Sequence, residues 1–203
     1  MEEFEKPPID EKSDEEVFRE YMEDLKLSPE DFNKKILDVG AGSAQFAKWA
    51  KEHGVSSEIY SLEPRKENLI EKEKGVVAKA ETMPFADESF DLIVSNAAIP
   101  NIYLGESSES IQKKIRSSLD EMMRVLKSGG EIRLARVLIG KEYEPQRDLS
   151  KSIENALAEL EKSGTVQVEK IRTSSDDTYE YQGHIPKKLL AEAYLIIIRK
   201  QKD

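Results

Sequence analysis

The chain contains no cysteine and only two histidines, His53 and His184. The absence of cysteine excludes disulfide bonds, a thiolate nucleophile and cysteine-ligated zinc or iron–sulfur sites. Two imidazoles so far apart in the sequence do not indicate a metal site. No apolar run approaches the roughly 20 residues that a membrane span requires, and the N-terminus has no apolar signal region. We therefore expect a cytoplasmic protein without a metal and without membrane contact.

Basic residues are outnumbered by acids, with 31 Lys and Arg against 41 Asp and Glu. Residues 1–35 hold thirteen acids and six bases, so most of the net charge of −10 lies there. The sequence has no basic stripe with interleaved aromatic residues, which argues against DNA or RNA as a substrate. Lys113, Lys114 and Arg116 form the densest basic group and are typical of a solvated helix face.

At 203 residues the chain can bury the core of one domain. We expect a flexible acidic segment over residues 1–14 and a single domain over residues 15–203, which begins with a helical extension. Helical spacing of apolar residues also predicts helices around residues 111–126 and 149–160, and β-like patterns predict strands at 165–172 and 193–199. The extension is predicted from apolar residues at helical spacing, namely Val17, Phe18, Tyr21, Met22 and Leu25.

The most informative segment is Ile36–Gln45, in which an apolar run ends in Asp38 and a Gly-x-Gly turn opens a helical pattern. Glycines at positions 40 and 42 let the backbone approach a ligand closely, next to the free N–H groups of a helix start. A dinucleotide fingerprint has a third glycine where this chain has Gln45. Asp38 would repel a pyrophosphate and attract an ammonium group. This pattern favours S-adenosylmethionine over a nicotinamide dinucleotide, although a turn without any ligand remains an alternative.

A second apolar run, residues 59–62, ends in Glu63 and Pro64, about twenty residues after the glycines. An acid at this spacing can accept hydrogen bonds from both hydroxyls of a ribose. Pro64 ends the strand and can start the following helix. Glu63 thus supports a nucleoside ligand without choosing between the two cofactor classes.

Four motifs in the expected order, over residues 36 to about 137, resemble class I S-adenosylmethionine-dependent methyltransferases. Besides the two above, residues 80–95 resemble the adenine loop and fourth strand of this family, and residues 124–132 resemble the helix–turn–strand element that leads into the fifth. The resemblance implies an α/β, Rossmann-like three-layer sandwich. Its sheet would be seven-stranded and mostly parallel, with one antiparallel strand near the C-terminus.

The resemblance also implies the cofactor-binding residues. The methionine part would lie on Asp38 and the turn, the ribose on Glu63, the adenine on residues 80–82, and the methyl group near residues 95 and 96. The expected set is Asp38, Gly40, Ala41, Gly42, Glu63, Pro64, Ala80, Glu81, Thr82, Ser95 and Asn96. One position departs from the family, because Lys79 stands where an acid often accepts from the adenine amino group, and lysine can only donate. Glu81 or backbone contacts could take over that role.

We therefore expect a methyltransferase whose acceptor is a small molecule rather than a protein or RNA. The sequence identifies no catalytic residue. Asn96, Asn101 and Tyr103 could orient an acceptor or could equally cap a loop against the N-terminal helix, and His184 is the one imidazole that could reach the site. The alternative function is a non-catalytic module that binds S-adenosylmethionine or S-adenosylhomocysteine, for instance as a partner subunit. The acceptor atom and the oligomeric state cannot be predicted.

Overall fold

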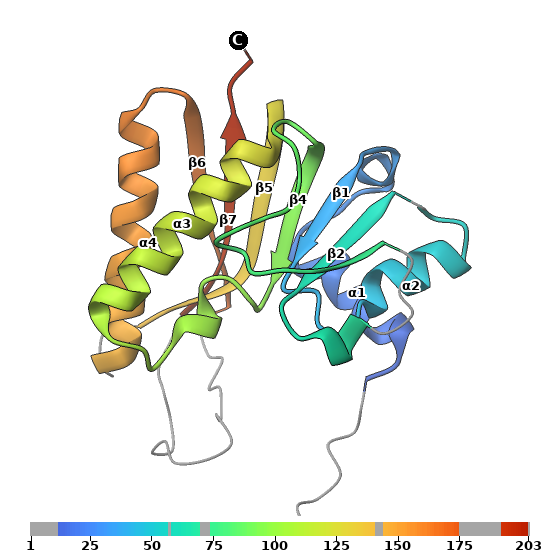
Figure 1. Cartoon of the computed structure of the whole chain (residues 1–203), viewed down its shortest axis with the longest axis horizontal. Coiled ribbons are helices and arrows are strands. Elements are labelled where there is room, and N and C mark those ends of the chain that lie inside the picture. The colour runs from blue at the N-terminus through green and yellow to red at the C-terminus, as the bar shows by residue number, and fades with distance from the viewer. Residues whose placement is uncertain (1–11, 57, 70–73, 141–143, 175–191, 203) are drawn as a thin grey trace, which may run out of the picture.

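The computed structural model describes residues 12–56, 58–69, 74–140, 144–174 and 192–202. Within them lies one seven-stranded sheet with the order β3-β2-β1-β4-β5-β7-β6 (Figure 1). β7 runs antiparallel to both of its neighbours, and the other described pairings are parallel. The predicted mostly parallel sheet with one antiparallel strand is therefore confirmed. Its strands are β1 (Ile36–Val39), β2 (Ile59–Glu63), β3 (Gly75–Val77), β4 (Phe90–Asn96), β5 (Leu126–Ile139), β6 (Val166–Ser174) and β7 (Glu192–Lys200).

Helices cover both faces of this sheet, which confirms the three-layer sandwich. One face packs against α3 (Ser108–Val125) and α4 (Glu144–Lys162), and the other packs against α1 (Asp14–Asp24) and α2 (Gln45–Glu52). Successive strand residues alternate between the two cores: Leu37 belongs to the first and Ile36 to the second. Three short 3-10 helices complete the described elements, namely η1 (Pro29–Asn33), η2 (Lys66–Leu69) and η3 (Asn101–Tyr103). None of the described helices is long and apolar enough to span a bilayer.

The predicted elements are found with small differences. The strands expected at 165–172 and 193–199 are β6 and β7, and the apolar stripes of α3 and α4 are buried as expected. The turn expected between α3 and β5 is instead an irregular first part of β5, where Gly129 has a φ of 76° and the pairing with β4 shifts register. Most of the predicted flexible segment 1–14, and His184, lie outside the described residues.

The N-terminal extension is fixed to the sheet by aromatic packing. The Phe18 ring of α1 stacks on Trp49 and Phe46 of α2, with centroid distances of 4.1 and 5.6 Å, and lies 5.7 Å from Phe32 of η1. The Tyr21 ring stacks on Phe46 at 4.4 Å. These contacts bury the apolar side of α1 against the domain.

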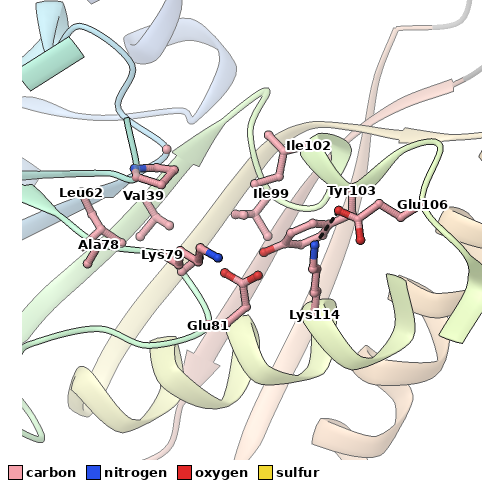
Figure 2. Close-up of a pocket in the computed structure, with 13 residues that line it drawn as sticks. Val39, Leu62, Ala78, Lys79, Glu81, Ile99, Ile102, Tyr103, Glu106 and Lys114 are labelled. Carbon is pink, nitrogen blue, oxygen red and sulfur yellow. Dashed lines mark hydrogen bonds and ion pairs between the residues drawn. The ribbon is translucent and has the colours of Figure 1, made fainter. Parts of the chain in front are cut away.

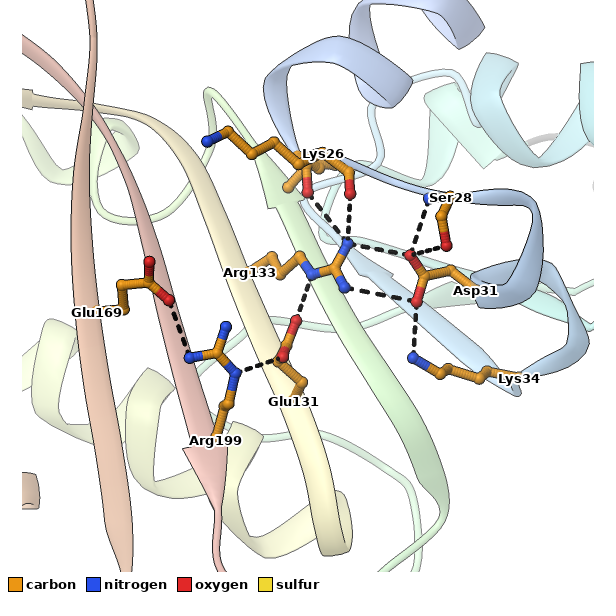
Figure 3. A network of polar contacts seen from close by, with 9 residues as sticks. Lys26, Ser28, Asp31, Lys34, Glu131, Arg133, Glu169 and Arg199 are labelled. Carbon is orange, nitrogen blue, oxygen red and sulfur yellow. Dashed lines mark hydrogen bonds and ion pairs between the residues drawn. The ribbon is translucent and has the colours of Figure 1, made fainter.

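A polar network anchors the end of the same extension (Figure 3). The Arg133 guanidinium of β5 donates to the carbonyl oxygens of Leu25 and Lys26, at 3.2 and 2.9 Å, and to Asp31 of η1 at 3.1 Å. It also pairs with Glu131, to which Arg199 of β7 donates at 2.9 Å. Because Arg133 satisfies carbonyls that the C-terminus of α1 leaves without helical partners, it holds the helix end at a fixed place on the sheet.

Candidate functional site

The glycine turn lies at the carboxyl end of β1 and is shaped by its neighbours. Gly40 has a φ of 78°, and a Cβ atom there would lie 2.4 Å from the Cβ atom of Ala98, in the loop after β4. Gly42 has a φ of 53° and faces open space, and its N–H donates to Glu63 at 3.2 Å. Ala41 lies between them and is buried. The turn therefore requires glycine at position 40 for packing and leaves room beside position 42 for a ligand.

Asp38 precedes this turn and is completely buried, with 0% exposure. Its two carboxylate oxygens accept one shared hydrogen bond from the Tyr21 hydroxyl of α1, at 3.3 and 3.2 Å. Burial raises the pKa of the Asp38 carboxyl from 3.8 to about 7; the Tyr21 hydroxyl lowers it and the nearby Glu63 carboxylate raises it. A buried carboxylate with so little compensation would be stabilised by a cation placed next to it.

Glu63 ends β2 and is also buried, at 3% exposure. Unlike Asp38 it has several donors: one oxygen accepts from the Arg65 Nε at 2.7 Å, the Arg65 backbone N–H at 3.3 Å and the Asn68 amide at 3.2 Å, while the other accepts from Gly42. These bonds fix the position of the carboxylate at the mouth of the turn. The oxygen that accepts from Gly42 has only this one bond, so it keeps a lone pair that can accept from a ligand hydroxyl group.

An apolar pocket of about 210 Å³ opens next to these two strand ends (Figure 2). Its lining combines the ends of β1 and β2, the loop after β3 and the loop after β4. The predicted residues Gly40, Pro64, Ala80 and Glu81 line it, as does Lys79, whereas Thr82 is exposed and is not in the lining. The full lining is Val39, Gly40, Leu62, Pro64, Ala78, Lys79, Ala80, Glu81, Ile99, Ile102, Tyr103, Glu106 and Lys114.

Polar groups stand at one end of the pocket. Glu106 accepts from the Lys114 ammonium at 2.6 Å, so each neutralises the other. The Tyr103 hydroxyl is bonded to Ser118 at 2.8 Å, and the Glu81 carboxylate faces it (Figure 2). Burial raises the pKa of Tyr103 above its usual value, the Ser118 hydroxyl lowers it and Glu81 raises it. Tyr103 is therefore a poor candidate for a general base.

The side chains expected near the reacting group are engaged within the protein. Ser95 accepts from the Ile99 backbone N–H at 3.1 Å, and the Asn96 amide donates to Asp24 of α1 at 3.1 Å. The Asn101 amide bridges backbone groups of Arg136 and Leu138. These contacts favour the alternative in which the asparagines brace the loop against its surroundings. The Asn96 carbonyl oxygen is buried and lacks a hydrogen-bond partner among the described residues, so a ligand donor could be accommodated there.

Arg124 of α3 holds the loop that carries the pocket residues 79–81, and sequence reasoning did not anticipate this role. Its guanidinium donates to the carbonyl oxygens of Met83 and Phe85, at 3.0 and 2.8 Å, and to Glu121 at 2.8 Å. Glu121 in turn accepts from the Met83 backbone N–H at 2.7 Å. Both backbone polar groups of Met83 are thus bonded to the helix, its N–H to Glu121 and its carbonyl oxygen to Arg124. No local pattern signals this contact, because it joins residues some forty positions apart.

The comparisons agree with this geometry. Residues 37–134 match the family model described as a methyltransferase domain. The structure of an S-adenosylmethionine-dependent methyltransferase from Methanosarcina mazei superposes with a TM-score of 0.56 at 17% identity, covering 87% of this chain and 99% of that one, which shows a shared fold. Together with the motifs and the sheet order, these findings support a class I S-adenosylmethionine-dependent methyltransferase domain over residues 37–134.

Two relatives extend the comparison. An uncharacterised protein of Methanocaldococcus jannaschii is 32% identical over 59% of this chain and 55% of its own length. The ubiquinone/menaquinone biosynthesis C-methyltransferase of Rickettsia prowazekii is 30% identical over 57% of this chain and 49% of its own length. The chain therefore spans about half the length of the curated relatives it matches.

Proposed function

We propose that this protein binds S-adenosylmethionine at the carboxyl ends of β1 and β2 and transfers its methyl group to a small molecule. The observation that carries the proposal is the buried Asp38 carboxylate beside the glycine turn and the apolar pocket. The α-ammonium of the cofactor would supply the cation that Asp38 needs, Glu63 would accept from the ribose hydroxyls, and the pocket would hold the adenine ring. This assignment explains why the protein buries two acids and gives Glu63 several hydrogen-bond donors but Asp38 only one.

The sulfonium group of the cofactor supplies an activated methyl group and a good leaving group. The task of the protein is then to hold the acceptor in line with the methyl group and to exclude water, which can contribute about 7–11 kcal/mol of the barrier. Ser95, Asn101 and Tyr103 are all hydrogen-bonded within the protein. They are therefore better suited to form a rigid side of the acceptor site than to transfer a proton. An acceptor that carries no acidic proton at its reacting atom would require no general base.

A small-molecule acceptor is supported by two observations. The Rickettsia relative is named as a C-methyltransferase of ubiquinone and menaquinone biosynthesis. The net charge of this chain is −10, which disfavours electrostatic attraction of nucleic acid. The acceptor of this protein is therefore best sought first among small metabolites, with phenolic and carbon nucleophiles at the start of the panel.

Calorimetric titration with S-adenosylhomocysteine, with NADH as the control ligand, tests the cofactor part of the proposal. We expect binding of the adenosyl ligand at micromolar concentration and no binding of NADH. Binding of NADH alone would contradict the role of Asp38, because its carboxylate should repel the pyrophosphate. The panel of acceptors is then screened for formation of S-adenosylhomocysteine from S-adenosylmethionine. Tight binding without turnover on any acceptor would favour the non-catalytic binding module.

A further inference from the structure

The N-terminal helix contributes a polar group to the site from outside the residues that match the family model. Tyr21 lies on α1, and its hydroxyl reaches the carboxylate of Asp38 on β1, at 3.3 and 3.2 Å from the two oxygens. Tyr21 is 7% exposed and Asp38 is 0% exposed, so water does not compete for this contact. The hydroxyl is thus the one protein hydrogen-bond donor described at the Asp38 carboxylate.

The direction of this hydrogen bond follows from the charges around it. Burial, together with the Asp38 carboxylate, raises the pKa of Tyr21 well above its usual value, so Tyr21 keeps its proton. Asp24 of α1 faces Tyr21, and Glu63 of β2 faces Asp38. Both of these neighbours are acids and disfavour an ionised Asp38 or Tyr21. The Tyr21 hydroxyl therefore donates, and it opposes the cost of ionising Asp38.

We propose that Tyr21 is a positioning residue for the cofactor: its hydroxyl favours the ionised form of the Asp38 carboxylate and orients it for the α-ammonium group, so that the docked N-terminal helix is part of the cofactor site. This inference rests on the proposed contact between Asp38 and S-adenosylmethionine. A carboxylate can accept from the hydroxyl and the ammonium at the same time, because each oxygen has two lone pairs. The two donors then act together on one buried charge.

The docking of α1 gives this contact a fixed geometry. The Tyr21 ring is stacked on Phe46 of α2 at 4.4 Å, and Phe18, one turn earlier, is stacked on Trp49 at 4.1 Å. At the other end, Arg133 binds the carbonyls that follow the helix. Removal of the hydroxyl alone leaves all of these contacts in place, so the substitution Tyr21→Phe separates the hydrogen bond from the packing.

Titration calorimetry of Tyr21→Phe with S-adenosylhomocysteine, at several values between about pH 5.5 and 8.5, tests the inference. In the wild-type protein we expect affinity to rise as the pH increases through about 7 and to level off above it, because binding requires the ionised Asp38. Without the donor the pKa of Asp38 rises further. The variant should bind roughly tenfold more weakly at neutral pH, with its plateau displaced to higher pH. Tyr194→Phe is the matched control, because its hydroxyl contacts Glu192 on β7 and should leave both affinity and pH profile unchanged.

Three results would overturn the inference and leave the proposed function intact. Equal affinity of Tyr21→Phe and wild type at every pH would mean that the hydroxyl does not act on Asp38. Tighter binding by the variant would mean that Tyr21 competes with the ammonium group. A uniform loss at all pH values, with an unchanged plateau position, would indicate a structural effect only. Failure of the wild-type protein to bind S-adenosylhomocysteine would instead contradict the proposed function.

Discussion

The carboxyl ends of β1 and β2 each present a buried acid to the same turn, but the protein surrounds the two acids differently. Glu63 accepts from four donor groups, among them the Arg65 guanidinium and the Gly42 N–H. Asp38 accepts from one hydroxyl, and its pKa rises to about 7 through burial. The charge on Glu63 is therefore compensated before any ligand arrives, whereas that on Asp38 is not.

This difference separates two roles in recognition. A compensated carboxylate offers a ligand little net charge but a well-defined pair of acceptors, which suits the reading of ribose hydroxyls. A buried carboxylate with few donors destabilises the free protein. A bound cation removes this cost, so such a carboxylate contributes strongly to the free energy of binding. We infer that Asp38 provides most of the affinity for the cofactor and that Glu63 provides selectivity for its ribose.

The substitution Asp38→Asn should give the largest effect, since it removes the charge and keeps the shape. Affinity for S-adenosylhomocysteine should fall roughly 100-fold or more, as expected when a buried ion pair loses one member. The free energy of unfolding of the ligand-free protein should instead increase. Because the folded pKa of Asp38 lies above its ordinary value of 3.8, its favourable contribution is complete below about pH 4 and is lost as the pH rises through about 7. The free Asn variant should therefore gain stability relative to wild type over that range.

Calorimetry and chemical denaturation at about pH 5 and pH 8 measure the two effects. Asp91→Asn is the control, because Asp91 lies near the start of β4, at the amino ends of the parallel strands and so away from the glycine turn, and accepts from Lys127 and the Lys35 backbone. It should leave affinity for the ligand unchanged. If Asp38→Asn binds as tightly as wild type, the two acids do not differ in the way inferred above.

The substitution Glu63→Ala should give a smaller and more selective effect. We expect about a tenfold loss of affinity for S-adenosylhomocysteine, because hydrogen bonds to a charged group are lost, and little loss for its 2′,3′-dideoxy analogue. The same titration with both ligands measures the difference. Glu58→Ala is a suitable control, since Glu58 lies just before β2, is exposed and pairs with Lys74. Equal losses for both ligands would mean that Glu63 orders the turn without reading the hydroxyl groups.

Local sequence patterns were sufficient to predict the strand ends and the turn that carry this site. The order of strand, acid, glycine turn and helix placed Asp38 and Gly40 correctly at the end of β1, and the spacing placed Glu63 at the end of β2. These features depend on residues that are neighbours in the chain or on the fixed geometry of parallel strands. All of the residue-by-residue contacts with the cofactor, those of Asp38, Gly40 and Glu63 included, stay predictions.

Contacts between distant segments could not be predicted in this way. Helical spacing assigned Tyr21 to the apolar side of α1, which is correct for its ring, but gave no sign that its hydroxyl reaches Asp38. Likewise Arg124 was part of a recognised motif, yet its bonds to Met83 and Phe85 depend on how α3 crosses the loop. In both cases the polar contact joins segments far apart in the sequence, and only the tertiary arrangement reveals it.

The substitution Arg65→Gln should give the smallest effect. It measures how much the contact with Arg65 contributes to the role of Glu63 in binding. The Arg65 side chain is 66% exposed, and pairs of this kind contribute about 0.2–1 kcal/mol. Gly42 and Asn68 would still hold the carboxylate. We therefore expect affinity for S-adenosylhomocysteine to fall less than about fivefold, and the loss to shrink in high salt, because salt screens the exposed guanidinium.

A double-mutant cycle with Glu63→Ala identifies the cause of that small loss. If Arg65 acts only through Glu63, the substitution Arg65→Gln should have no further effect once Glu63 is alanine. Lys66→Gln, a neighbouring exposed position, controls for the loss of one positive charge. Tighter binding by Arg65→Gln would show that the guanidinium occupies an oxygen that the ribose needs. Glu63 would then have to release a protein contact to bind the ribose, whereas Asp38 keeps its contact with Tyr21, and the donors around Glu63 would oppose binding of the ligand.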